Sequence, residues 1–287
     1  MKGVILTAGK ATRLRPATLA IGKVNLPIYD KPMIFYSVSV MIESGIRDIY
    51  IVCNDRDVAI FKELLKDKYD KFGVHINFVV ENRTLGSAFA LNATKDYCDD
   101  DDILLMFGDN IFIDSSLSQN IQNAYKELEG VSVFGLKVSD PERYGVVEKD
   151  KNGNILSIEE KPKVAKSNLV IIGLMLLKKG VFDYIDRLSP SARGEYETTD
   201  MINLYLSEGK AKVVELPDSC QWLDTGTHDS MLEASEAVRT FQMKNSLIGS
   251  IEVALYRRGL ISKEDFLDLI KIYTKDYQEK LIKTIEI

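Results

Sequence analysis

The stretch Val4-Ile-Leu-Thr-Ala-Gly-Lys-Ala-Thr-Arg-Leu-Arg-Pro16 decides the fold that we expect. Its apolar start predicts a short buried strand, which leads directly into a loop of small residues. Small residues let the backbone approach a ligand closely, and the amides of such a turn can point at an anion. The junction therefore suits a triphosphate, although a basic surface loop after a strand would explain the same pattern. The basic side chains of the loop are Lys10, Arg13 and Arg15.

Two common phosphate-binding motifs are absent from the sequence. G-x-x-x-x-G-K-[ST] does not occur, and Gly9-Lys-Ala departs from G-x-G-x-x-G at its second glycine. The missing glycines and the positive charge of the loop disfavour a dinucleotide-dependent dehydrogenase.

The composition limits the class of protein. A chain of 287 residues can bury a large core, so we expect one large α/β domain with or without a small appendage. The net charge of −6 argues against a general nucleic-acid binder. No apolar run approaches the roughly 18 residues that cross a bilayer, and no signal-peptide pattern opens the chain, so we expect a cytoplasmic protein. The cysteines lack C-x-x-C pairing and predict neither a disulfide framework nor a zinc site; they are Cys53, Cys98 and Cys220.

Strand and helix patterns alternate through the first half of the chain. Such alternation predicts a doubly wound, mostly parallel sheet, in which ligands bind beyond the carboxyl ends of the strands. The opening loop and the segment Gly108-Asp-Asn110 would both lie at that edge. The expected strands are 49–53, 76–80 and 103–107, and the expected helices are 58–69 and 87–97.

The second half of the chain mixes strands, turns and helices. Asn152-Gly153 is a strong hairpin signal, and short charge-rich helical segments follow residue 245. We expect one main domain over residues 1–244, with halves at 1–130 and 131–244, and a helical appendage over 245–287. The expected strands are 131–138, 144–148, 155–160 and 170–177; the expected helices are 198–207, 229–243, 251–258 and 263–273; residues 221–226 are expected to form a loop.

Asp109 and Asp224 are candidate metal ligands. Asp109 follows an apolar strand and a glycine, and Asp224 follows Trp222-Leu223. Mg²⁺ takes oxygen ligands, commonly one or two carboxylates together with substrate phosphates and waters. An aspartate beside a glycine is also an ordinary turn residue, so the residues alone leave both interpretations open.

The two opening motifs resemble the start of the sugar-1-phosphate nucleotidylyltransferases, and most closely their glucose-1-phosphate thymidylyltransferase branch. The motifs are Leu-x-Ala-Gly-x-x-Thr-Arg-Leu-x-Pro at residues 6–16 and Lys-x-x-Leu-Pro-(x)3-Lys-Pro-Met at residues 23–33. Further motifs extend the resemblance from residue 3 to beyond residue 240. It implies a Rossmann-like nucleotidyltransferase fold with a small β-hairpin subregion for the sugar and a C-terminal helical appendage. Residues 1–130 would bind the nucleotide, and residues 131–244 would bind the sugar.

The resemblance implies three catalytic residues. Arg13 would brace the α-phosphate and the departing pyrophosphate, and Lys23 would contact the phosphates from the other side. Lys161, within Glu159-Glu-Lys-Pro162, would hold the sugar phosphate, although an exposed charged turn would look the same. Nucleotidyl transfer depends on positioning and charge neutralisation, so no covalent nucleophile is required.

The resemblance also implies the binding residues and the metal. Mg²⁺ would be held by Asp109 and Asp224. Arg193 lies in a segment that would close over the sugar, or it forms a surface ion pair. The expected nucleotide-binding residues are Leu6, Ala8, Gly9, Arg13, Lys23, Asn25, Glu81, Gly86 and Asp109, and the expected sugar-phosphate-binding residues are Asn110, Tyr144, Gly145, Glu160, Lys161, Gly173 and Arg193.

The sequence departs from the pattern of the family at four positions. Ala8 and Ala11 stand where glycine is usual, and alanine does not easily adopt positive φ. Asn25 replaces a longer glutamine. Glu81 stands where the thymidylyltransferase branch usually has a glutamine that reads the pyrimidine. An ionised glutamate only accepts hydrogen bonds, so base preference is expected to be relaxed or changed, unless Glu81 points away and backbone groups read the base.

The expected function is magnesium-dependent transfer of a nucleotidyl group from a nucleoside triphosphate, first of all dTTP, to a sugar-1-phosphate, first of all glucose-1-phosphate. The products would be an NDP-sugar for dTDP-sugar biosynthesis and pyrophosphate. One alternative is the same reaction with UTP, GTP or CTP, and another is a non-catalytic sugar-nucleotide sensor. The resemblance also implies a homotetramer, and no nucleic acid or membrane partner is expected.

Overall fold

A nine-stranded sheet forms the centre of the protein. The computed structural model describes residues 1–244 and 246–286. The expected α/β class is confirmed, and the expected strands 49–53, 76–80 and 103–107 begin within one residue of the observed ones. The strands of the sheet are β1 (Lys2–Leu6), β4 (Asp48–Cys53), β5 (His75–Val80), β6 (Ile103–Phe107), β8 (Val131–Lys137), β9 (Gly145–Lys149), β10 (Ile155–Glu160), β11 (Leu169–Leu177) and β12 (Ala211–Glu215).

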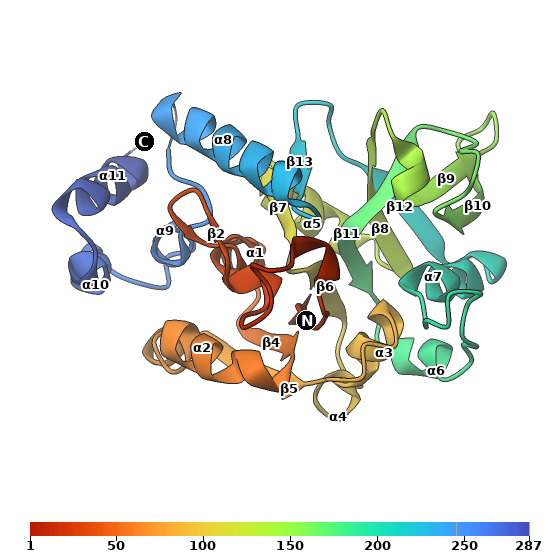
Figure 1. Ribbon diagram of the computed structural model, residues 1–287, viewed down its shortest axis with the longest axis horizontal. Helices are drawn as coiled ribbons and strands as arrows, with labels where there is room; N and C mark the ends of the chain where they lie inside the picture. The colour runs from red at the N-terminus through yellow and green to blue at the C-terminus, as the bar shows by residue number, and fades with distance from the viewer. Residues whose placement is uncertain (245, 287) are drawn as a thin grey trace.

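The sheet combines a parallel part with an antiparallel part (Figure 1). β1 pairs in parallel with β4 and β6, and β4 pairs in parallel with β5. β11 runs antiparallel to β6, β8 and β9, whereas β12 runs parallel to β8. Leu6 and Phe107, the last residues of β1 and β6, are partners in the ladder. The opening loop and the segment that follows β6 therefore leave the same edge of the sheet, as expected.

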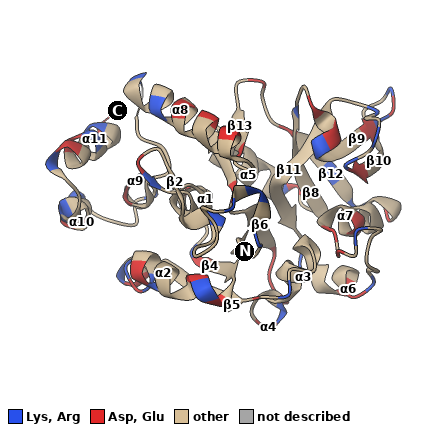
Figure 2. Cartoon of the chain, in the orientation of Figure 1, with Lys and Arg blue, Asp and Glu red and all other residues tan. Residues whose placement is uncertain are grey.

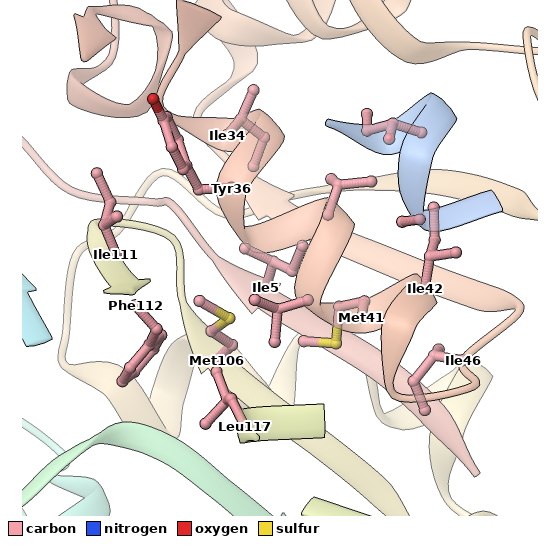
Figure 3. Close-up of a cluster of buried hydrophobic side chains, with 14 of the residues drawn as sticks. Ile5, Ile34, Tyr36, Met41, Ile42, Ile46, Met106, Ile111, Phe112 and Leu117 are labelled. Atoms are coloured by element: carbon pink, nitrogen blue, oxygen red, sulfur yellow. The ribbon is translucent and has the colours of Figure 1, made fainter. Parts of the chain in front are cut away.

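Buried side chains cover both faces of the sheet. Along β1, Val4 and Ile5 belong to two different apolar clusters, because successive side chains of a strand point to opposite faces. The helix α1 (Ile34–Glu43) covers one face, where Ile5 and Met106 of the sheet lie beside Met41 (Figure 3). The other face is covered by α3 (Ser87–Asn92), α6 (Val181–Ile185) and α7 (Thr198–Ser207).

Four expected segments differ from the structure. The expected helix 58–69 is observed as α2 (Asp55–Leu65), and the expected helix 263–273 is divided into α10 (Lys263–Leu269) and the 3₁₀ turn η5 (Ile270–Ile272). The expected loop 221–226 contains the strand β13 (Gln221–Asp224), which pairs with β7 (Asn110–Ile113). The prediction was wrong because this strand is short and is specified by its pairing with a distant segment. The expected helix 87–97 is interrupted between α3 and α4 (Lys95–Cys98), where the buried Thr94 hydroxyl donates to the Leu91 carbonyl and competes with helical hydrogen bonding.

The expected hairpin at Asn152-Gly153 is confirmed, since β9 and β10 pair in antiparallel on either side of it. Gly153 has φ +86°, which glycine adopts without steric cost. The remaining elements are β2 (Pro27–Ile28), β3 (Lys31–Pro32), α2 (Asp55–Leu65), α5 (Leu117–Lys126), α8 (His228–Lys244) and the single 3₁₀ turns η1 (Thr12–Leu14), η2 (Lys23–Asn25), η3 (Asp70–Phe72), η4 (Pro141–Arg143) and η5 (Ile270–Ile272).

The charge-rich C-terminal helices form a group at one end of the molecule (Figure 1, Figure 2). α9 (Ile251–Arg257) packs on α1, and α10 (Lys263–Leu269) and α11 (Lys275–Ile285) pack around α9. Their buried side chains join the cluster under α1. The expected boundary at residue 245 lies outside the described residues, and the division into domain and appendage stays a prediction. Among the described residues, no helix combines the length and apolar character needed to span a membrane.

Candidate active site

Two adjoining cavities open at the carboxyl edge of the parallel strands. The loop cavity, about 590 Å³, lies between the opening loop and the segment after β5. The hairpin cavity, about 480 Å³, lies beside β9, β10 and β11. Both volumes fall within the usual range for small-molecule sites. The two cavities share a wall that includes Arg13, Asp109 and Arg193.

The structure gathers nearly all of the residues that the sequence singled out. The loop cavity is lined by Leu6, Ala8, Gly9, Arg13, Lys23, Glu81, Gly86 and Asp109. The hairpin cavity is lined by Asn110, Tyr144, Gly145, Glu160, Lys161, Gly173, Arg193 and Asp224. Asn25 lines neither cavity, because its side-chain amide turns toward Asp57 and donates to that carboxylate at 3.1 Å.

The opening loop is held in a conformation that is unusual for alanine. Ala11 has φ 42° and ψ 46°, in the left-handed region, which costs a non-glycine residue about 1–3 kcal/mol. Its carbonyl accepts hydrogen bonds from the Thr18 hydroxyl at 2.8 Å and from the Leu14 amide at 3.0 Å. These bonds hold the turn that carries Arg13 between the two cavities, so alanine at this position does not prevent the loop from forming.

Lys23 and Asp109 form an ion pair at the wall between the cavities. Lys23 Nζ lies 2.8 Å from Asp109 Oδ2, and Asn110 Nδ2 donates to Asp109 Oδ1 at 2.8 Å. Burial opposes ionisation of Asp109, but the charge and hydrogen bond of Lys23 together with the Asn110 amide outweigh it and lower the pKa of Asp109. Asp109 is therefore a carboxylate at neutral pH.

Asp224 reaches the same place from β13. Its strand partner in the β7 ladder is Asn110, the neighbour of Asp109. Burial and the negative charge of Asp109 raise the pKa of Asp224, while Lys23, Arg143 and Arg13 oppose that shift. Arg143 also contacts Asp224 directly, at 3.4 Å. The two acids that the sequence singled out thus lie on one cavity wall and repel each other.

The donor set at this wall matches one kind of metal site. Within residues 1–244 and 246–286, no group of three or more His, Cys, Asp and Glu side chains could hold a metal ion. Asp109 and Asp224 alone would leave most coordination positions to other oxygens. Mg²⁺ commonly binds in this way, through one or two carboxylates completed by phosphate and water oxygens. A cation here would also relieve the repulsion between the two acids.

Lys161 stands at the rim of the hairpin cavity. It has φ +47°, and its Nζ lies 3.0 Å from Glu160 Oε1. Glu160 Oε2 accepts a hydrogen bond from the Thr199 hydroxyl at 2.7 Å. Arg193 lies 3.2 Å from Glu197 and 3.7 Å from Glu160. Lys161 and Arg193 therefore both face this cavity, each within ion-pair distance of a carboxylate.

Asn110 organises the floor of the hairpin cavity. Its Oδ1 accepts hydrogen bonds from Trp222 Nε1 at 2.6 Å and from the Gly173 amide at 3.3 Å. Tyr144 meets the Trp222 ring edge-on, with centroids 4.9 Å apart. A Cβ at Gly173 would lie 2.6 Å from Phe107 Cγ, so only glycine fits there. The sequence prediction missed Trp222 because its role depends on the pairing of β13 with β7.

Glu81 is almost fully buried and is paired with Arg83. Its Oε1 accepts from the Arg83 amide at 2.7 Å and from Nε at 3.0 Å, and Oε2 lies 2.7 Å from a terminal guanidinium nitrogen. The hydrogen bond from the Arg83 side chain lowers the pKa of Glu81. The sequence predicts that the Glu81 carboxylate accepts hydrogen bonds from the base. In the structure the carboxylate accepts them from Arg83, a partner that the prediction did not include.

Comparisons with known proteins agree with this geometry. The family model described as "Nucleotidyl transferase" matches residues 2–240. A glucose-1-phosphate thymidylyltransferase of Neisseria meningitidis is 39% identical over 288 residues, with 100% of both chains covered. One of Mycolicibacterium smegmatis is 38% identical and covers 100% of this chain and 99% of its own.

Solved structures share the fold. A Bacillus anthracis protein described as a glucose-1-phosphate thymidylyltransferase, in complex with a sucrose, superimposes with a TM-score of 0.77 and 36% identity, covering 84% of this chain and 96% of its own. A UDP-glucose pyrophosphorylase complexed with UDP-glucose superimposes with a TM-score of 0.75 at 23% identity, covering 83% and 98%. At that identity the second similarity concerns the fold alone.

Proposed function

This chain belongs to the nucleotidyl transferase family, and from that premise we propose that it transfers a thymidylyl group from dTTP to glucose 1-phosphate, releasing pyrophosphate. The observation that carries the proposal is the shared wall of the two cavities. Arg13 and Asp109 line both cavities, Lys23 lines the loop cavity, and Lys161 lines the hairpin cavity. A nucleotide in the loop cavity and a sugar phosphate in the hairpin cavity would therefore meet at this wall.

The reaction needs little beyond positioning and neutralised charge. A phosphate oxygen of glucose 1-phosphate would attack the α-phosphorus of dTTP and form the new P–O bond. The bond between the α-phosphorus and the bridging oxygen would break, and its electron pair would leave with pyrophosphate. Lys161 would hold the attacking phosphate. Arg13 and Lys23 would neutralise the charge that develops on the α-phosphate and on the leaving group.

We propose Mg²⁺ as the metal, held by Asp109 and Asp224. Bound there, Mg²⁺ supplies positive charge that offsets the charge of the triphosphate. Asp109 now shares its carboxylate with Lys23 at 2.8 Å. When the nucleotide binds, Lys23 would turn from this carboxylate toward the phosphate oxygens. The phosphate oxygens would then replace the Asp109 carboxylate as the negative partner of the ammonium group.

Two alternatives differ from this proposal, one in the substrate and one in the activity. Glu81 could change the base preference toward GTP or CTP, whose bases carry donors for an ionised acceptor. A non-catalytic sugar-nucleotide sensor is a second alternative. It is disfavoured because each of the five proposed chemical residues lines at least one of the two cavities; they are Arg13, Lys23, Asp109, Lys161 and Asp224.

We also propose the expected division of the chain and its assembly. Residues 1–244 would be the nucleotidyltransferase domain, with the nucleotide bound mainly by residues 1–130 and the sugar by residues 131–244. Residues 245–287 would be the appendage. A cytoplasmic homotetramer in dTDP-sugar biosynthesis is the assembly and setting that the family resemblance implies, and light scattering after size exclusion would measure the assembly.

The test is release of pyrophosphate by the purified protein with glucose 1-phosphate, Mg²⁺ and each of dTTP, UTP, CTP and GTP in turn. Release with dTTP supports the proposal. Release only with GTP or CTP would make Glu81 the selector of the base and would overturn thymidylyl transfer. No release with any of the four, combined with nucleotide binding, would favour the sensor.

A further inference from the structure

A buried carboxylate behind the loop cavity holds the segment that carries Lys23. Asp57 lies in the first turn of α2 and is 2% exposed. It lines neither cavity. We propose that Asp57 is a positioning residue, which sets the place of the Lys23 ammonium group by binding the backbone turn on both sides of it. This inference rests on the proposed function, because it assigns Lys23 to the phosphates of the nucleotide.

Asp57 binds the two ends of the turn η2 through a single oxygen atom. Its Oδ1 accepts a hydrogen bond from the Gly22 amide at 2.6 Å and from Asn25 Nδ2 at 3.1 Å. Gly22 immediately precedes Lys23, and Asn25 closes the turn by donating its amide to the Gly22 carbonyl at 3.1 Å. The backbone of Lys23 therefore lies between two points that are fixed to the same carboxylate.

Gly22 shows how closely the chain approaches this carboxylate. Its φ of −67° is available to every residue, so the glycine is not required for its backbone conformation. A Cβ at this position would lie 2.5 Å from Asp57 Oδ2, far inside van der Waals contact. Any larger residue would push the carboxylate and the turn apart, so the glycine is needed for the close approach itself.

The same end of α2 also holds the rest of the opening loop. The Arg56 guanidinium donates to the carbonyls of Thr18 and Leu19 at 3.3 and 3.2 Å, and its Nε lies 3.7 Å from Asp57 Oδ2. Asn54 Nδ2 donates to the Gly9 carbonyl at 3.3 Å. The loop that would surround the triphosphate is thus attached to one helix end near its beginning and near its end.

The consequence concerns the nucleotide more than the sugar phosphate. Lys23 lines the loop cavity and not the hairpin cavity. Loss of Asp57 would release the turn and leave the Gly22 amide without its partner. A displacement of about 1 Å at a positioning group can cost roughly 100-fold in rate. The expected signature is therefore a change in kcat and in KM for the nucleotide, with KM for the sugar phosphate unchanged.

The experiment compares steady-state kinetics and Tm for wild type, Asp57→Ala, Asp57→Asn, Gly22→Ala and the double variant Gly22→Ala/Asp57→Ala. Asp55→Asn, an exposed acid in the same helical turn, is the matched control. Asp57→Ala should lower kcat/KM for dTTP by roughly 10- to 100-fold. Asp57→Asn keeps an oxygen acceptor for both hydrogen bonds and should recover most of that loss.

The double variant separates positioning from general damage. Gly22→Ala should reproduce the loss in the wild-type background, and it should add little once the carboxylate is gone, because the two changes disturb one contact. Asp57→Ala with wild-type kcat and KM, whatever its Tm, would overturn the inference. If Asp57→Ala does not fold, Gly22→Ala takes its place in the test, and wild-type kcat and KM in Gly22→Ala would then overturn the inference. An inactive wild type would instead reject the proposed function.

Discussion

Lys23 Nζ lies 2.8 Å from Asp109 Oδ2, so the cation expected at the phosphates and the carboxylate expected at the metal form an ion pair before any ligand arrives. The pair keeps Asp109 ionised in a partly buried wall, where an unpaired charge would be unfavourable. It also holds the Lys23 ammonium group at the loop cavity. A bound triphosphate would offer negative charge to Lys23, and Asp109 would then be able to hold a metal ion.

Replacing Lys23 with alanine should remove most of the activity. The variant loses one of the two cations that we assign to the α-phosphate and the leaving group, and loss of one such group typically costs about 100-fold or more in kcat. The measurement is kcat for pyrophosphate release with dTTP. Lys62→Ala, on the exposed side of α2, is the control and should behave as wild type. A Lys23→Ala enzyme within threefold of wild type would remove Lys23 from the mechanism.

Replacing Lys161 with alanine should weaken binding of the sugar phosphate and leave binding of the nucleotide unchanged. A hydrogen bond to a charged group contributes about 1.5–3 kcal/mol. Because the Lys161 side chain is 47% exposed, we expect a contribution at the lower end of this range. KM for glucose 1-phosphate should therefore rise about tenfold. KM for dTTP should change little. Lys163→Ala, also exposed and two residues away, is the matched control. An equal rise in both KM values would show that Lys161 does not belong to the sugar-phosphate site.

Replacing Asp224 with asparagine should shift the metal requirement. Removal of divalent metal with EDTA should abolish turnover of the wild type, and added Mg²⁺ should restore it. Asp224→Asn removes one of two carboxylates, so the Mg²⁺ concentration for half-maximal rate should rise roughly tenfold or more. Asp229→Asn, an exposed acid at the start of α8, should leave it unchanged. A wild type that remains active in EDTA contradicts the metal assignment.

Replacing Glu81 with glutamine should change how stability depends on pH. The hydrogen bond from Arg83 lowers the pKa of Glu81 in the folded protein, so the pair stabilises the fold above the unfolded pKa of about 4.3. That contribution is lost as the pH falls through the folded pKa. Because the Arg83 side chain is 67% exposed, the pair should contribute at most about 1 kcal/mol to the free energy of unfolding.

The measurement is the free energy of unfolding between pH 7 and pH 3. The wild type should lose more stability on acidification than Glu81→Gln. Glu236→Gln, at an exposed position on α8, should follow the wild type. Parallel curves for wild type and Glu81→Gln would show that the pair with Arg83 does not stabilise the fold.

Much of the site could be predicted because its signals are local in sequence. The apolar run before Ala8-Gly9 predicts a buried strand, which β1 confirms, and the small and basic residues after it predict a loop suited to phosphates. The hairpin at Asn152-Gly153 follows from turn chemistry in the same way. Each of these features depends on neighbours within a few residues, so a single sequence contains the whole signal.

The rest depends on contacts between distant segments. Gly22 is bound by Asp57, 35 residues away, and nothing within either segment indicates that pairing. Trp222 reaches Asn110, 112 residues away, through a strand too short to show alternation. Asn25 was expected at the nucleotide because of its position after Lys23, but its amide faces α2. The pairing of Glu81 with Arg83 was the exception, since a basic residue two positions away is visible in the sequence.

The most direct test of thymidylyl transfer is a competition. The purified protein is given glucose 1-phosphate, Mg²⁺ and equal concentrations of dTTP, UTP, GTP and CTP, and the nucleotide sugars formed are quantified by mass spectrometry. We predict that dTDP-glucose is the main product and that its yield falls at least roughly 100-fold in Lys23→Ala. A main product that carries guanine or cytosine, or no nucleotide sugar at all from folded protein, would contradict the proposed function.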